Sequence, residues 1–301
     1  MNKKESFKIW LAYFCVCFFW GTTYFGIKYA LIYTTPDVLF CSRQITAGII
    51  LFFISYIINK DKLPQIHEMK KIVITSLLLV VGANLIMGLS LMYIPSGLAA
   101  LVGSFMPFYI LAINYLAGVK TNTSYITWIG LSLGLAGLLL IFYDSFALIT
   151  EGTYALGLFF IFLSNLSWAA GTVYAKAHKV EASLLMGTSL QLILGGLAAL
   201  PIVLILGSHE TTRYTFELGM IFIYMVIFGS IIGYVSFVYV VQKMPPAIMS
   251  LYAYINPIVA IILGSLFLQE SFTWYTLAAI VLVLGGVFIV NYDNMRHEAK
   301  P

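Results

Sequence analysis

The sequence predicts an all-α membrane protein in which ten transmembrane helices form two inverted five-helix repeats. Three observations support this prediction: an apolar composition, ten separate apolar stretches, and matching features in the two halves of the chain. Of the 301 residues, 61% are hydrophobic and only 9% are charged. Water-soluble domains carry about 25% charged residues, so a chain of this composition is expected to lie in a lipid bilayer.

The ten apolar stretches each approach the roughly 20 residues that a helix needs to cross the hydrocarbon core of a membrane. They cover residues 9–31, 36–58, 71–93, 95–117, 124–143, 154–175, 183–206, 216–242, 245–268 and 272–291. Between 71 and 117, and between 216 and 268, there is almost no polar break, and Pro95 and Pro245 mark the predicted turns. The connections are short, so no separate soluble domain is expected.

The second half of the chain repeats features of the first at a nearly constant spacing of about 150 residues. The matching pairs, in order, are Trp20 with Trp168, Lys28 with Lys176, Pro95 with Pro245, Pro107 with Pro257, Gly137 with Gly286, and Tyr143-Asp144 with Tyr292-Asp293. The second and third stretches match the seventh and eighth only weakly. Residues 1–148 and 149–301 are therefore predicted repeats of one transmembrane domain. Because each holds five helices, an odd number, they are expected to lie in opposite orientations.

Lysine and arginine set the predicted orientation in the membrane. Most of the 16 Lys and Arg residues fall on the cytoplasmic side if both termini are cytoplasmic. We therefore expect the N- and C-termini to be cytoplasmic. The first stretch has a counterpart in the second half, so it is interpreted as a helix rather than a signal peptide. No basic run with interleaved aromatic residues is present, so no nucleic-acid partner is expected.

Two stretches contain an interior proline at matching positions, Pro107 and Pro257. Proline lacks the N–H group that would bond four residues back, so the carbonyl groups of Gly103 and Ala253 lose a donor. In hydrocarbon a stranded carbonyl costs several kcal/mol, so both are expected to face protein or a watery cavity. Two interrupted helices at equivalent positions indicate the central site of a transporter, and both prolines are predicted hinges.

Arg43 lies about seven residues into the second stretch. An arginine at the centre of a membrane helix costs at least about 2.5 kcal/mol on insertion scales. It either contacts an anionic group of a substrate or lines a water path, or else it bonds to freed carbonyls or extends to the interface. The sequence favours neither interpretation, and Asp37 is near enough along the helix to share a structural role.

The other candidate site residues are aromatic and polar side chains at membrane depth. Trp20 and Trp168 lie well inside their stretches, away from the headgroup level where tryptophan usually concentrates. They either wall a site for an amphipathic metabolite or simply pack between helices. Polar groups at this depth usually face the bundle interior. The predicted substrate-binding set is Trp20, Tyr24, Arg43, Asn84, Ser104, Trp168, Gln191, Tyr234, Tyr252 and Asn256.

The sequence indicates no catalytic residue, cofactor or metal site. All four histidines lie in predicted loops, and the acidic residues nearest the membrane are at predicted helix ends. A midplane proton relay, a Walker motif and a metalloprotease motif are therefore not indicated. Sodium held by carbonyl groups of a broken helix stays an open possibility. The three cysteines fall in apolar stretches and are interpreted as small buried hydrophobic residues.

At these residues the chain resembles the ten-helix, EamA-type branch of the drug/metabolite transporter superfamily, particularly its bacterial exporters. The resemblance rests on Trp20-Gly21 with Lys28, on Arg43, on residues 94–107, on Ser167-Trp168, and on residues 245–264 followed by Glu270. It covers nearly the whole chain and implies a bacterial inner-membrane protein that exports small metabolites, such as amino acids, or toxic compounds by alternating access. Lys120 departs from the pattern, because the first repeat often has there the acidic residue that Glu270 supplies in the second.

The predicted function is secondary transport, with export of small metabolites or drug-like solutes. The alternatives are uptake by the same fold, or a non-transporting membrane protein such as a scaffold or a lipid-modifying enzyme. The expected partners are a small-molecule substrate and the lipid bilayer. Substrate identity, transport direction, coupling ion and oligomeric state do not follow from the sequence.

Overall fold

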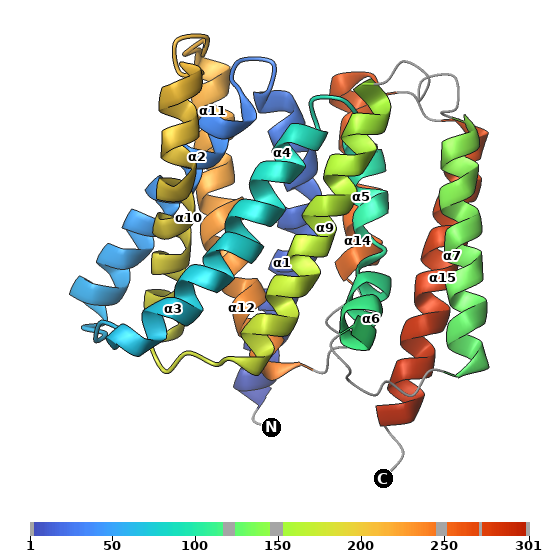
Figure 1. Ribbon diagram of the computed structural model, residues 1–301, viewed down its shortest axis with the longest axis horizontal. Coiled ribbons are helices and arrows are strands. Elements are labelled where there is room, and N and C mark those ends of the chain that lie inside the picture. The colour runs from blue at the N-terminus through green and yellow to red at the C-terminus, as the bar shows by residue number, and fades with distance from the viewer. Residues whose placement is uncertain (1–2, 117–123, 145–152, 245–251, 271–272, 299–301) are drawn as a thin grey trace.

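The computed structural model describes residues 3–116, 124–144, 153–244, 252–270 and 273–298, and all regular secondary structure in these ranges is helical. The helices stand beside one another as a bundle (Figure 1). The start of α1 and the end of α15 lie at the same end of this bundle, which is the lower end in Figure 1.

The first half of the chain contains nine helical elements within the described residues. They are α1 (Lys3–Ala30), α2 (Pro36–Phe53) with its π-helical continuation η1 (Ile54–Ile58), α3 (Ile66–Thr75), the π-helical η2 (Ser76–Leu85), α4 (Ile86–Ser90), α5 (Ser96–Gly103), α6 (Met106–Leu116) and α7 (Tyr125–Asp144). The elements α3, η2 and α4 follow one another without a gap and form one long helical rod.

The second half begins with α9 and ends with α15. Its described elements are α9 (Thr153–Ala177), α10 (Leu184–Leu206), α11 (Phe216–Tyr224), the π-helical η3 (Met225–Gly233), α12 (Tyr234–Lys243), α14 (Tyr252–Leu268) and α15 (Trp274–Glu298). Here α11, η3 and α12 also form one continuous rod, with its π-helical part in the middle like that of the first half.

Six of these helical runs are long and apolar enough to cross a membrane: Lys4–Ala30, Pro36–Ile58, Ile66–Ser90, Thr153–Ala177, Leu184–Leu206 and Phe216–Lys243. Shorter apolar helices cover Tyr125–Gly137, Ile255–Leu268 and Trp274–Val290. Large apolar side chains also cover the outside of the bundle, and Ile205, Phe216 and Trp274 each expose 80% or more of their surface. Soluble monomers rarely present such extensive apolar patches, so this surface fits a lipid environment.

Local sequence explains several helix starts. Pro36 opens α2, where a missing N–H group costs nothing because the first turn has no internal partner for it. Ser183 and Thr215 precede α10 and α11, and their side-chain oxygens accept hydrogen bonds from the N–H groups of Met186 and Leu218. These three starts agree with the predicted stretches to within one residue.

The two interior prolines behave differently from each other. The stretch containing Pro107 is interrupted, but the break lies at Ser104 and Phe105, between α5 and α6, and Pro107 is the second residue of α6. Contrary to the prediction, α14 is not interrupted at Pro257 and runs continuously from Tyr252 to Leu268. Proline removes only one donor, so a helix can continue through it when nearby groups supply others.

Asn256, the residue before Pro257, forms two hydrogen bonds near this part of α14. With its amide nitrogen oriented toward two carbonyl oxygens, the side chain donates to Tyr252 at 3.2 Å and to Cys17 at 2.8 Å. The second bond joins α14 to α1. The carbonyl group that loses a donor to Pro257 is that of Ala253, so these two bonds hold this part of α14 in place without replacing the lost one.

Contacts between the two halves occur in exchanged pairs. Helix α1 of the first half packs against η3, α12 and α14 of the second half. Its counterpart α9 of the second half packs against η2, α5 and α6 of the first half. Similarly, α2 contacts α10 and η3, and α10 contacts η2. Elements at corresponding positions in the two halves therefore make corresponding contacts.

The pair α7 and α15 lies at one edge of the bundle (Figure 1). Their backbones approach so closely that a Cβ atom added at Gly130 would lie 2.6 Å from the carbonyl oxygen of Gly286. A Cβ atom at Gly286 would lie 2.5 Å from the carbonyl oxygen of Gly130. Glycine at both positions permits this approach, as small residues do at membrane-helix interfaces.

Candidate functional site

A cavity lies between the two halves of the bundle. Its volume is about 830 Å³ when the parts open to solvent are included. The described residues that line it are Trp20, Thr23, Tyr24, Arg43, Gln44, Val80, Ala83, Asn84, Met87, Ala100, Gly103, Ser104, Met106, Ser164, Asn165, Trp168, Leu192, Gly229, Ser230, Tyr234, Tyr252 and Asn256.

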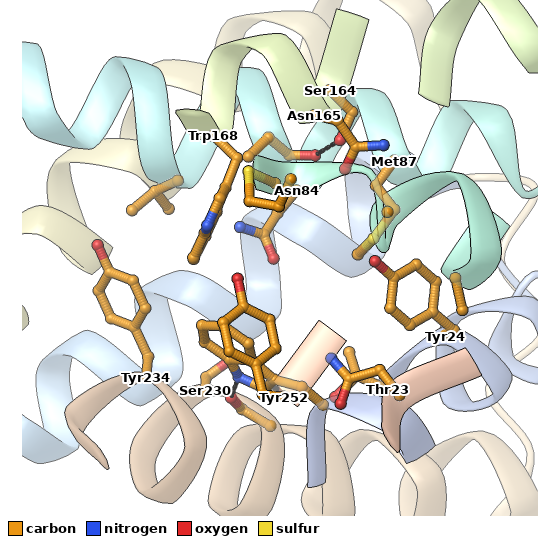
Figure 2. Close-up of a pocket in the computed structure, with 18 of the residues that line it drawn as sticks. Thr23, Tyr24, Asn84, Met87, Ser164, Asn165, Trp168, Ser230, Tyr234 and Tyr252 are labelled. Carbon is orange, nitrogen blue, oxygen red and sulfur yellow. Dashed lines mark hydrogen bonds between the residues drawn. The ribbon is translucent and has the colours of Figure 1, made fainter. Parts of the chain in front are cut away.

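Side chains enter this cavity from opposite walls. Figure 2 shows Asn84, Asn165 and Trp168 on one side of the hollow, with Thr23 and Tyr252 on the other. The residues come from helices of both halves, since α1, α2, η2, α4 and α5 belong to the first half and α9, η3, α12 and α14 belong to the second. The cavity is thus a property of the interface between the halves.

Nine of the ten predicted substrate-binding residues line the cavity. The exception is Gln191 of α10, whose side-chain oxygen accepts a hydrogen bond of 2.8 Å from the hydroxyl of Tyr234. Gln191 therefore lies behind a lining residue and orients it. That these residues bind a substrate stays a prediction.

An aromatic cluster forms one part of the lining. Trp20 and Trp168, the matching tryptophans of the two halves, contact each other edge to face with ring centroids 5.1 Å apart. Tyr252 lies 5.7 Å from Trp20, also edge to face, and Phe237 lies 4.8 Å from Trp20 and 4.9 Å from Trp168. Edge-to-face contacts are the favoured geometry of aromatic pairs and hold the rings in defined orientations.

Both indole groups of this cluster have hydrogen-bond partners. The Trp20 N–H donates to the carbonyl oxygen of Gly229 in η3 at 3.4 Å. The Trp168 side chain hydrogen-bonds to Tyr252. Buried indole groups need such partners, and here the partners come from other helices. The cluster therefore links α1, α9, η3 and α14 around the cavity.

Arg43 is the charged residue among the described lining. Only 3% of its surface is exposed, and its Nη2 donates to the Oδ1 atom of Asn84 at 3.2 Å. Asn84 in turn donates through Nδ2 to the carbonyl oxygen of Leu79 at 2.9 Å, so its amide is held in one orientation. Arg43 is bonded to an amide side chain rather than to carbonyls freed by proline, and it does not extend to the interface.

Arg43 retains unused donor capacity. Its Nε atom has no hydrogen-bond partner, and within the described residues Arg43 forms no ion pair. Asp37 does not pair with it, and the Oδ2 atom of Asp37 is itself buried without a partner. The shared structural role considered for Asp37 is therefore absent from the described part of the chain.

Two π-helical segments border the cavity, and sequence reasoning missed both. Val80, Ala83 and Asn84 line it from η2, and Gly229 and Ser230 line it from η3. Short π-helical insertions are frequent at functional sites because they re-aim side chains within a helix. Hydropathy carries no signal for them, since both segments are mostly apolar and resemble the α-helical parts of the same rods.

Sequence reasoning also left polar lining residues out of the predicted set. Gln44 is buried beside Arg43 and accepts a hydrogen bond of 3.3 Å from the hydroxyl of Ser230. Ser164 donates to the carbonyl oxygen of Ala83 at 2.6 Å. Helical spacing could have identified Ser164, because it precedes Trp168 by four residues and so lies on the same face.

Asn165 is another lining residue outside the predicted set. It is 5% exposed, its side chain hydrogen-bonds to Tyr109, and its Nδ2 atom has no partner. Together with the unpartnered Nε of Arg43, this atom leaves the cavity with buried donors that a ligand can satisfy.

One end of the bundle is closed by a carboxylate at the start of α5. Glu270 follows α14 and accepts hydrogen bonds from the Ser96 N–H at 2.8 Å, the Ser96 hydroxyl at 3.0 Å and the Gly97 N–H at 3.4 Å. A negative charge at a helix N-terminus is favourable because the first N–H groups have no internal partners. Lys28 lies close by and donates to the carbonyl oxygens of Leu91 and Ile94. We refer to the Glu270–Ser96 contact as the upper latch.

The opposite end is also joined across the two halves. Asp61, in the connection between η1 and α3, accepts hydrogen bonds from the hydroxyls of Ser55 at 2.6 Å and Ser183 at 2.7 Å. The carboxylate of Glu68 accepts from the N–H group of Glu181, and Lys71 donates to the carbonyl oxygen of Lys179. We refer to the Asp61–Ser183 contact as the lower latch.

The lining offers groups that suit the binding of a small solute. Within the described ranges, no group of three or more His, Cys, Asp or Glu side chains is arranged to hold a metal ion. The lining combines aromatic faces, amides, hydroxyls and one guanidinium. Such a set can recognise a small organic solute by apolar contact and a few hydrogen bonds.

Comparison with known proteins gives consistent matches over the whole chain. The profile of the EamA-like transporter family matches residues 7–143 and, separately, residues 155–292. The "Uncharacterized inner membrane transporter YedA" of Escherichia coli strain K12 is 26% identical over 302 aligned positions, which cover 100% of this chain and 96% of that protein. "Protein PecM" of Dickeya dadantii is 28% identical, with 96% of this chain and 95% of that protein covered.

A solved structure also matches. It is described only as the crystal structure of a protein, it is 14% identical in sequence, and it superposes with a TM-score of 0.67. The superposition covers 96% of this chain and 98% of the solved one. At this identity the match supports the fold alone.

Proposed function

Because the chain belongs to the EamA-like transporter family, we propose that it is a secondary transporter that moves a small organic solute through the cavity between its halves. The single observation that carries this proposal is the cavity itself, which is of ligand size and is lined by residues of both halves. A site at the interface of two repeats is the arrangement that alternating access requires, because movement of one half against the other changes the side from which the site is reached.

We propose further that the chain forms ten membrane spans in two inverted repeats. Support comes from the exchanged contacts, in which α1 packs on η3, α12 and α14 while α9 packs on η2, α5 and α6. Contacts that exchange in this way are expected of two units related by a two-fold axis. The separate family matches to residues 7–143 and 155–292 support the same division.

For the cell, we propose an inner-membrane location with both termini in the cytoplasm. A matching relative carries the words "inner membrane transporter" in its name. The end of the bundle where α1 begins and α15 ends is also the end where α3 begins (Figure 1). The connection before α3 contains Lys60 and Lys62, and positive charge favours the cytoplasmic side.

The proposed transport cycle uses the latches and the broken helix. Release of the upper latch, with the lower latch closed, would open the cavity toward one side; the reverse would open it toward the other. The break between α5 and α6 at Ser104 lies beside the cavity and is the proposed flexible point of the first half. We propose export as the physiological direction, in keeping with the sequence resemblance to bacterial exporters.

Transport by the purified protein in liposomes tests this proposal. Proteoliposomes are loaded with a defined mixture of amino acids and of aromatic acids, amides and amines, and release is followed by mass spectrometry. We expect at least one compound to leave faster than from protein-free liposomes. Trp168→Ala should abolish that release, whereas Trp128→Ala should preserve it, because Trp128 is on α7, is 61% exposed and does not line the cavity.

Two outcomes contradict the proposal. If no compound in the mixture leaves faster than from protein-free liposomes, the transporter function is wrong for this range of solutes and a scaffold role gains support. If Trp168→Ala releases the compound at the wild-type rate, the cavity is not the pathway. Direction is measured in the same vesicles by comparing release with uptake from outside.

A further inference from the structure

We propose that the transported solute carries one carboxylate and no ammonium group, and that Arg43, held in place by Asn84, receives this carboxylate. The proposal rests on the transporter function proposed above and specifies its substrate class. Four features lead to it: the unpaired charge of Arg43, the fixed orientation of Asn84, the absence of acidic groups from the described lining, and the aromatic cluster.

The first feature is the state of the Arg43 guanidinium. Arginine stays charged in proteins, and its guanidinium offers five N–H donors in a planar fork. Within the described part of the chain it donates one hydrogen bond, to Asn84, and its buried Nε atom has no partner. Burying a charge without a counter-ion is strongly unfavourable, whereas a carboxylate can accept two parallel hydrogen bonds from the same fork. A carboxylate on a ligand would therefore supply both the counter-charge and the acceptors that the described protein groups do not offer Arg43.

The second feature is the way Asn84 is held. Its Nδ2 donates to Leu79 within η2 and its Oδ1 accepts from Arg43. In Figure 2 the Asn84 side chain projects into the middle of the hollow, and the Tyr252 hydroxyl points into the same space from the opposite wall. Asn84 thus holds the guanidinium at the cavity wall, and the Tyr252 hydroxyl offers a neutral donor to an anion there.

The third feature is the charge of the remaining lining. Among the described residues that line the cavity, none besides Arg43 carries a formal charge, and Asp and Glu are absent from that set. An ammonium group would meet only neutral oxygens and aromatic faces, and it would be repelled by Arg43. A zwitterionic amino acid would leave its ammonium without an ionic partner, so a simple carboxylate fits better.

The fourth feature is the rest of the cavity. A volume of about 830 Å³, open parts included, is far more than an inorganic anion needs. Trp20, Trp168 and Tyr252 offer ring faces and edges in fixed orientations, and Met87 and Leu192 add apolar surface. These groups gain most from an apolar or aromatic body. The solute class is therefore a monocarboxylate with an apolar body.

Four compounds with one phenylpropyl skeleton separate the possibilities: 3-phenylpropionate, 3-phenylpropanamide, 3-phenylpropylamine and phenylalanine. Binding to the purified protein at pH 7 is measured by isothermal titration and by the shift in unfolding temperature. We expect 3-phenylpropionate to bind at least tenfold more tightly than the isosteric amide, the amine and phenylalanine. Titration with sodium chloride alone serves as the arm for an inorganic anion.

Variants then assign the carboxylate to Arg43. Arg43→Gln should weaken binding of 3-phenylpropionate at least tenfold and leave binding of the amide within twofold. Arg43→Lys should recover part of the loss, because it keeps the charge without the planar fork. The matched control is Arg213→Gln, the same exchange at an exposed residue outside the cavity, and it should bind all four compounds like the wild type. If Arg43→Gln does not fold, the wild-type preference for the acid over its amide still decides the matter.

Several results would overturn the proposal. Equal binding of acid and amide by the wild type would do so, as would unchanged acid binding by Arg43→Gln. Tighter binding of phenylalanine or the amine would replace the proposed class but leave the transporter function intact. If chloride raises the unfolding temperature as much as 3-phenylpropionate does, the site binds an inorganic anion instead. If none of the four binds, release of a compound other than a monocarboxylate from the mixture above would refute only the substrate class, and absence of all release would refute the function too.

Discussion

Replacement of single glycines in α15 tests the packing of α7 against α15. In Gly286→Ala, the new Cβ atom would lie 2.5 Å from the Gly130 carbonyl oxygen and 2.7 Å from the Gly134 nitrogen. Both are backbone atoms and cannot rotate away, so the two helices must separate by about 1 Å to restore an ordinary contact of 3.4 Å or more. Overpacking of this kind costs about 1–3 kcal/mol.

The adjacent Gly285 provides a matched control, because a Cβ atom there meets nothing within 4 Å. Both variants gain the same helix propensity of alanine over glycine, about 1 kcal/mol. The difference between the two variants therefore isolates the cost of the clash. We expect Gly286→Ala to be less stable than Gly285→Ala by about 1–3 kcal/mol.

Equilibrium unfolding in mixed micelles, followed by circular dichroism, measures this difference. Equal stability of the two variants would refute the reasoning, because it would mean that α7 and α15 do not approach as closely as described. A second substitution checks the partner helix: Gly130→Ala would place a Cβ atom 2.6 Å from the Gly286 carbonyl oxygen and should destabilise similarly.

Further predictions concern the two latches. Glu270→Gln keeps an oxygen acceptor for the Ser96 hydroxyl but removes the negative charge at the start of α5, so the free energy of unfolding should fall by about 0.3–1 kcal/mol. The control is Glu210→Gln, in an exposed loop, which should leave the free energy of unfolding unchanged. Equal stability of the two variants would contradict the upper latch. Hydrogen bonds from Ser55 and Ser183 hold the pKa of Asp61 below its ordinary value. A depressed folded-state pKa stabilises at neutral pH, and that stabilisation is lost as pH falls through the folded-state pKa. The unfolding temperature of Asp61→Asn should therefore fall less than that of the wild type between neutral and strongly acidic pH, and parallel curves would show that the lower latch is not pH-dependent.

The helical runs could be predicted because hydropathy and helix-end residues act locally. The starts of α2, α10 and α11 follow from Pro36, Ser183 and Thr215, whose effects on a first turn need no tertiary context. The break between α5 and α6 was expected at Pro107 and occurs three residues earlier. Proline fits the first turn of a helix better than its interior, so a chain that breaks near Pro107 places it at the start of the following helix.

The candidate site could be predicted in part for a different reason. Polar groups at membrane depth face the protein interior, so selecting residues such as Arg43, Asn84 and Asn256 selects the cavity lining almost automatically. Gln191 also faces the protein interior, but its side chain hydrogen-bonds to Tyr234 and does not line the cavity. Which polar group lines the space and which supports a neighbour depends on packing between helices, and no local pattern records that.

The contact between Trp20 and Trp168 gives the molecule an internal optical probe. Its five tryptophans include Trp10, Trp128 and Trp274 on the outer surface, and phenylalanine at those three positions would leave the central pair as the sole indole fluorophores. Sliding of one half past the other must alter a ring separation of 5.1 Å. Emission from this pair would then follow each turnover in real time, without any attached dye.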